Sequence, residues 1–139
     1  MHYPILVLID QPDRDLTEAY VREAIAETMT PLLQDDDDAE SGGWWDGYQI
    51  GGRWSGLLDG FMPVRGYESW SALLERPREW VFVNRCDILP VSEMTNEQWR
   101  RFFGIVVHGE PYEEADKPEL AVLRAQHSTK LAVVVDCHN

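Results

Sequence analysis

The chain has 139 residues with an ordinary hydrophobic content of 44%, and its 25 acidic against 12 basic residues give a net charge of −13. That length predicts a single domain over 1–139, and the acidic balance disfavours duplex nucleic acid or an anionic membrane as partner, because neutralising phosphates needs a basic patch. No run approaches the roughly 20 apolar residues of a membrane span, and the N-terminus lacks the pattern of a signal peptide, so we expect a cytoplasmic protein.

The chain opens with an apolar run of strand length, residues 3–9, which ends at Asp10. A helix is predicted next, with Asp13 or Asp15 as its cap and Pro31 marking its end. Its apolar residues recur at spacings of four, four and three, which is one stripe of an amphipathic helix. The residues of this stripe are Val21, Ile25, Met29 and Leu32.

The second half of the chain alternates predicted helices with apolar strands. Thr95 and Gln98 have the spacing of a capping box, and Asp116 caps a later helix that has Pro118 in its first turn. The predicted elements are a helix over 67–75, a strand over 79–84, a helix from Thr95, a strand over 104–109, a helix over 116–126 and a strand over 130–137.

Together these elements predict an α+β fold, either a ferredoxin-like sandwich or a related one, with one layer of helices on a mixed sheet of about four strands. The first and last strands are nearly continuous in apolar residues, so we expect both at the centre of the sheet. Residues 34–66 form an insertion after the first helix, made of an acidic loop and a Gly/Trp-rich segment. Its tryptophans argue against disorder, and ordered loops of this length are usually functional.

The Gly/Trp segment, defined here as residues 42–60, holds seven of the ten glycines and three of the six tryptophans. So many glycines disfavour a helix. The segment is therefore interpreted as a strand or a tight loop pair around residues 48–54, in which Gly51 and Gly52 permit a positive φ or a close backbone approach. Arg53 is the only basic residue within 23–64, so it either neutralises a buried carboxylate or meets an anion from outside.

Two interpretations of this segment remain open. In the first, its tryptophans pack the insertion onto the sheet, and Arg53 pairs with a carboxylate such as Asp46 or Asp59. In the second, the backbone N–H groups of the glycine pair and the Arg53 guanidinium bind a phosphate or carboxylate, while an indole stacks on a base or sugar. The predicted ligand-binding residues are Trp45, Tyr48, Gln49, Gly51, Gly52, Arg53 and Trp54.

Cysteine and histidine patterns offer little for catalysis or metal binding. Cys86 and Cys137 each close a predicted strand and could meet with His108 as a third ligand, but no C-x-x-C or H-x3-H spacing supports a metal centre. Cys137 and His138 are neighbours on a strand and point to opposite faces, so they do not form a nucleophile–base pair. We therefore expect reduced thiols, no metal, no cofactor and no catalytic residue.

The stretch WWDGYQIGGRWSG, residues 44–56, resembles the W-x-x-x-Q-I-G-G-R-W type core of small uncharacterised proteins encoded by tailed bacteriophages and some actinobacterial genomes. The VDCH sequence at 135–138 is similar to the end of those proteins. The segment is more faintly similar to phage ferredoxin-like proteins, in which a lysine stands where this chain has Arg53. The resemblance implies a ferredoxin-like fold and a phage-type origin, hence a host-cell cytoplasmic location, but no activity.

The function we expect is that of a phage-type accessory protein, an anti-defence candidate that binds a small anionic, nucleotide-like ligand without catalysis. One alternative is an acidic protein-interaction module that inhibits a basic host factor, and another is a small hydrolase of phosphorylated signals. If the chain forms a homodimer, the tryptophans of 34–66 make this insertion the expected interface.

Overall fold

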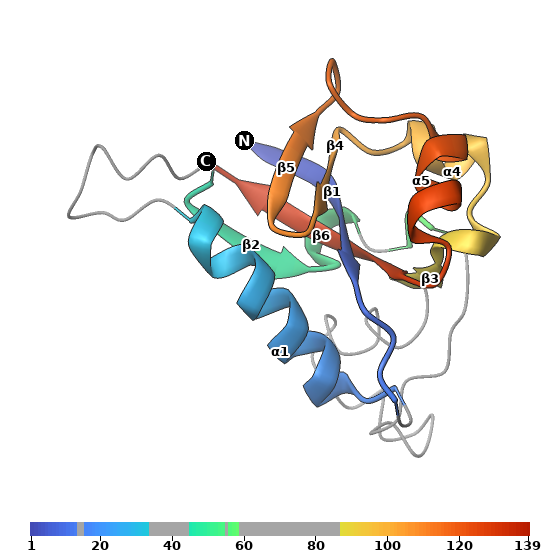
Figure 1. The fold of residues 1–139 in the computed structure, drawn as a ribbon. Helices are drawn as coiled ribbons and strands as arrows, with labels where there is room; N and C mark the ends of the chain where they lie inside the picture. The colour runs from blue at the N-terminus through green and yellow to red at the C-terminus, as the bar shows by residue number, and fades with distance from the viewer. Residues whose placement is uncertain (14–15, 34–44, 55, 59–86) are drawn as a thin grey trace.

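The computed structural model describes residues 1–13, 16–33, 45–54, 56–58 and 87–139, and it confirms the α+β class (Figure 1). Within these ranges, no helix has the length and apolar character needed to cross a bilayer. The elements in chain order are β1 (His2–Ile9), α1 (Glu18–Met29), η1 (Thr30–Leu32), β2 (Gly47–Ile50), η2 (Gly52–Trp54), β3 (Ile88–Pro90), η3 (Val91–Glu93), α4 (Asn96–Arg100), β4 (Gly104–Val107), β5 (Glu110–Glu113), α5 (Leu120–His127) and β6 (Leu131–His138).

The six strands form one mixed sheet with β1 and β6 at its centre, as their continuous apolar sequences predict. These two strands pair antiparallel, from His2 opposite His138 to Ile9 opposite Leu131. On its other edge β1 pairs in parallel with β4, and β4 pairs antiparallel with β5. On the far side of β6, β2 pairs with the C-terminal part of that strand and β3 with its N-terminal part.

Within the described residues the sheet has six strands, where about four were predicted. β3 has only three residues, and β5 contains Pro111 and two exposed glutamates, so neither carries a strong strand pattern. A proline is tolerated in β5 because this strand lies at the edge of the sheet. The mixed sheet is thus established, while the narrower prediction of a ferredoxin-like fold stays a prediction.

Helices pack on both faces of the sheet, so the predicted single layer of helices is wrong. Alternate residues of β1 point to opposite faces. Ile5, Val7 and Ile9 pack in one cluster with the buried side of α1, whereas Leu6 and Leu8 pack in a second cluster with residues of α4 and α5. Figure 1 shows α1 on one side of the strands and the pair α4 and α5 on the other. A strand that is apolar at every position is fully buried only when helices pack on both faces of the sheet.

The predicted stripe is buried, three of its residues in α1 and Leu32 in the following η1, and all four are at most 8% exposed. The cap of α1 is Thr17, whose hydroxyl accepts the N–H of Tyr20 at 3.1 Å, and the prediction of Asp13 in this position is wrong. Asp15 lies outside the described residues. Pro31 follows the end of α1 in the short η1 helix, as predicted.

The predicted capping box at α4 is confirmed: the N–H of Gln98 donates to Thr95 Oγ1, and the N–H of Thr95 donates to Gln98 Oε1. The predicted start of α5 is wrong, because the helix begins at Leu120 and Asp116 lies in the turn after β5. The predicted helix over 67–75, the predicted strand over 79–84 and the acidic run of 35–40 lie outside the described residues, as does Trp44.

Candidate functional site

The described part of the Gly/Trp segment forms β2 on β6 and then turns sharply at a pair of glycines. Gly51 and Gly52 have φ angles of 72° and 52°, which confirms the predicted positive φ at both positions. The N–H of Gly51 donates to the carbonyl of Val134 at 2.8 Å, so the turn begins while the chain is still bonded to β6. The short η2 helix, which contains Arg53, follows directly.

Asp136 of β6 anchors this turn, although it is a carboxylate that is only 3% exposed. Its Oδ2 accepts the backbone N–H of Arg53 at 3.0 Å, and its Oδ1 accepts a hydrogen bond from Nδ1 of His2 at 2.8 Å. A Cβ atom on Gly52 would lie 2.7 Å from the Cβ of Asp136, so glycine permits the close approach. One buried carboxylate therefore joins η2 to the central strands β1 and β6.

A second imidazole lies beside that of His2. The rings of His2 and His138 are neighbours, with centroids 5.3 Å apart. His138 also packs over the backbone of Gly47, where a Cβ atom would lie 3.0 Å from its Nε2. Arg53 is exposed, and its guanidinium has no ion-pair partner within the ranges that the structure describes. We call Arg53, His2, His138 and Asp136 the Asp136 cluster.

The structure places the predicted ligand-binding residues on opposite faces of the sheet. Trp45 is buried in the core cluster beneath α1, and Tyr48 packs half-buried against that cluster, where burial raises its pKa. Trp54 packs half-buried in the cluster on the other face, and its buried Nε1 has no hydrogen-bond partner among the described residues. Gln49 is exposed on β2. The structure thus brings Gly52 and Arg53 to Asp136, and it places Trp45, Tyr48 and Trp54 in the core clusters.

Backbone N–H groups in this turn already have acceptors. Those of Gly51 and Arg53 donate to Val134 and Asp136, and that of Trp54 donates to the carbonyl of Gly51 at 3.1 Å. The predicted use of free backbone N–H groups for an anion therefore has no support at these three positions. An anion at Arg53 would therefore be bound by the Arg53 side chain.

His2, Asp136 and His138 are the members of the cluster that the sequence analysis did not select as site residues. A usable signal was present for Asp136, because it is the one charged residue inside the apolar strand Leu131–His138. A charge in a buried strand requires a partner. For His2 the sequence carried no comparable signal, since the pairing of β1 with β6 supplies its position.

Cys137 lies next to the cluster in sequence but on the opposite face of the sheet, in the core beneath α1. Burial, and secondarily the charge of Asp136, raises the pKa of its thiol far above the ordinary value, so the thiol stays protonated and is a poor nucleophile. Cys86 lies outside the described residues. In the parts of the chain that the structure describes, no three His, Cys, Asp or Glu residues are grouped as metal ligands.

Comparison of the chain with protein-family models, curated proteins and solved structures found no match. Function is therefore inferred from the chemistry of the Asp136 cluster itself.

Proposed function

We propose that this protein binds a small anionic, nucleotide-like ligand at Arg53 without catalysing a reaction on it. The observation that carries the proposal is the attachment of Arg53 and His2 to the two oxygens of one buried carboxylate. An exposed guanidinium on a fixed backbone is a suitable donor for phosphate or carboxylate, because its planar fork makes paired hydrogen bonds.

The charges of the Asp136 cluster favour the binding of an anion. Both oxygens of Asp136 already accept hydrogen bonds, and this residue is buried, so it presents little free negative charge to a ligand. His138, whose ring neighbours that of His2, adds an imidazole N–H donor at the same end of the sheet. The net charge of −13 repels an extended polyanion, which favours a small ligand over a nucleic-acid strand.

A thermal-shift screen of nucleoside phosphates, cyclic dinucleotides and ADP-ribose tests this function. A ligand at a hundred times its Kd adds about 2.7 kcal/mol to the free energy of unfolding, which a melting curve detects. Arg53→Ala should abolish the stabilisation, whereas Arg100→Ala, which removes an exposed arginine of α4, should leave it intact. Failure of every probe to stabilise the wild-type protein, or equal stabilisation of the Arg53→Ala protein, contradicts the proposal.

Exposed acids at the edge of the sheet favour a second candidate, the acidic module that binds a basic host protein. Glu110 and Glu113 of β5, with Glu114 and Asp116 in the following turn, are all exposed and project from one edge. Pull-down with host lysate tests this candidate, because a complex held by these charges should weaken steeply as salt is raised. A complex that forms equally well at low and moderate salt contradicts it.

Either activity would suit an accessory protein of phage type, and counteracting host defence is the role that we propose for it. With β2, β3 and α4 set aside, the order β1–α1–β4–β5–α5–β6 has the βαββαβ sequence of ferredoxin-like folds, but β1 and β4 pair directly in parallel, where a split βαβ unit has another strand between them. The proposed role predicts that the gene lies among anti-defence genes, and a neighbourhood of housekeeping genes contradicts it.

A further inference from the structure

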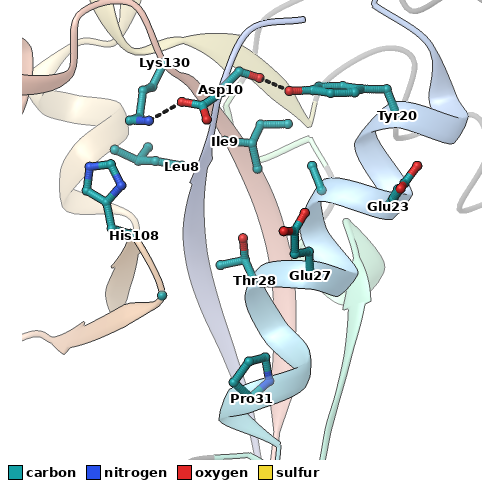
Figure 2. Close-up of a pocket in the computed structure, with 12 residues that line it drawn as sticks. Leu8, Ile9, Asp10, Tyr20, Glu23, Glu27, Thr28, Pro31, His108 and Lys130 are labelled. Atoms are coloured by element: carbon teal, nitrogen blue, oxygen red, sulfur yellow. Dashed lines mark hydrogen bonds and ion pairs between the residues drawn. The ribbon is translucent and has the colours of Figure 1, made fainter.

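A cavity of about 470 Å³ lies beside α1, at the end of β1 opposite to His2 (Figure 2). Its volume is within the range of small-molecule sites. Asp10 directly follows β1 and His108 directly follows β4, and these two strands are parallel neighbours. The carboxyl ends of adjacent parallel strands are a common position for ligand sites in sheets covered by helices.

One wall of this cavity, at the strand ends, carries basic side chains. Lys130 is largely buried, with 15% of its side chain exposed, and its ammonium group pairs with the carboxylate of Asp10. This pairing lowers the pKa of Asp10. Asp10 is 80% exposed, so water and salt weaken its ion pair with Lys130. The ammonium group of Lys130 also has further N–H donors for an incoming anion. His108 lies beside Lys130 on the same wall (Figure 2).

The opposite wall is formed by α1 and carries acidic side chains. Glu23 and Glu27 lie one helical turn apart on α1, and both line the cavity. Neither carboxylate has a hydrogen-bond or ion-pair partner in the described part of the chain, whereas Glu18 of the same helix pairs with Arg22. Figure 2 shows these two glutamates across the hollow from Lys130 and His108, with the apolar side chains of Leu8 and Ile9 between them.

The rim of the cavity is held in place by two features of its backbone. The Tyr20 hydroxyl of α1 donates to the carbonyl of Asp10 at 2.5 Å, which ties the helix to the end of β1. His108 has a φ of 53° and is the one residue other than glycine with positive φ among those that the structure describes. Such a conformation costs energy and is concentrated at binding and catalytic sites.

We propose that this cavity binds a small zwitterion, with its ammonium group against Glu23 and Glu27 and its acidic group at Lys130 and His108. The apolar floor between the two walls fits a short hydrocarbon spacer. A ligand with only one charge would leave the opposite wall without a partner. This site lies at the other end of the central strands from the Asp136 cluster, so the inference does not depend on the proposed function.

Three probes of matched chain length test the inference: ε-aminocaproate carries both charges, caproate only the acid and hexylamine only the amine. Amide NMR of the isotope-labelled full chain reports binding through the signals of Asp10, Glu27 and Gly109. The zwitterion should shift these signals and bind about tenfold more tightly than either single-charge probe. Equal or tighter binding of hexylamine overturns the assignment to a zwitterion, and so does the absence of any shift with ε-aminocaproate.

Substitutions separate this cavity from the Asp136 cluster. Glu27→Gln should weaken ε-aminocaproate about tenfold while leaving caproate binding no weaker. Glu113→Gln removes an exposed carboxylate of β5 that does not line the cavity, and it should leave the titration unchanged. Arg53→Ala should also leave the titration unchanged. Loss of ε-aminocaproate binding in the Arg53→Ala protein, or unchanged affinity in the Glu27→Gln protein, overturns the proposal.

Discussion

The backbone N–H of Arg53 donates to the buried carboxylate of Asp136 at 3.0 Å, and this contact is possible because the residue before Arg53 is a glycine. Gly52 brings the chain so close to β6 that no side chain fits between them. The contact fixes the backbone of Arg53 while its side chain is exposed. The same carboxylate orients His2, so this one residue organises the proposed anion site.

Replacement of Gly52 by alanine should destabilise the protein more than the same change at Gly56. Both glycines have positive φ, 52° and 88°, so both variants carry a backbone penalty of about 1–2 kcal/mol. A Cβ atom at Gly52 would also lie 2.7 Å from Asp136, whereas no atom of the described residues lies within 4 Å of one at Gly56. Urea unfolding of the two variants measures the difference, and equal losses would show that Asp136 moves aside freely.

Arg53→Ala should change the free energy of unfolding by less than about 0.5 kcal/mol, because its side chain is exposed and has no ion-pair partner in the described ranges. Loss of one member of a buried ion pair would instead cost about 3–5 kcal/mol. Arg53→Lys should be equally stable but should bind an anion more weakly, since lysine cannot form the planar bidentate contact. Melting curves with and without ligand measure both effects, and a large fall in Tm for Arg53→Ala would make Arg53 a structural residue.

Lys117→Met should destabilise the second half of the chain by about 1–3 kcal/mol. The Lys117 ammonium group donates to the carbonyls of Trp99 and Phe102, at 3.2 and 2.7 Å, and lies 4.7 Å from the centre of the Trp99 ring. Burial lowers its pKa, which indicates that the charge is partly removed from water. Methionine keeps the apolar stem and removes the donors. Arg124→Met, at an exposed position of α5, is the control for loss of a positive charge, and equal unfolding free energies for both variants would contradict the prediction.

His127 should titrate below the usual histidine pKa near 6.5, because burial and then the charges of His108 and Lys130 lower its pKa. Between the lowered folded-state pKa and 6.5, the unfolded chain binds more protons at this residue than the folded one. The contribution of His127 to stability is therefore complete above pH 6.5 and is lost as the pH falls through that window. NMR titration measures the midpoint, and His108→Gln should raise it. A midpoint that His108→Gln does not move would contradict the coupling of the two imidazoles.

Local patterns in the sequence determined those structural features that depend only on residues close together in the chain. The stripe from Val21 to Leu32 predicted the buried side of α1, and the capping box of Thr95 and Gln98 predicted the start of α4, because both patterns act within one or two helical turns. The continuous apolar runs of β1 and β6 predicted central strands, because a run of this kind is also a local pattern of consecutive residues. At Gly51 and Gly52, the residue type itself indicated the left-handed backbone.

Only the tertiary structure decided which of these elements meet. His2 and Asp136 are 134 residues apart, and the register of β1 against β6 places them together. The cavity beside α1 likewise requires the parallel pairing of β1 with β4, which brings Asp10 and His108 to one end of the sheet. Strand register and the packing of a helix on a sheet are set by the whole core rather than by neighbours along the chain, so no local pattern in the sequence specified either cluster.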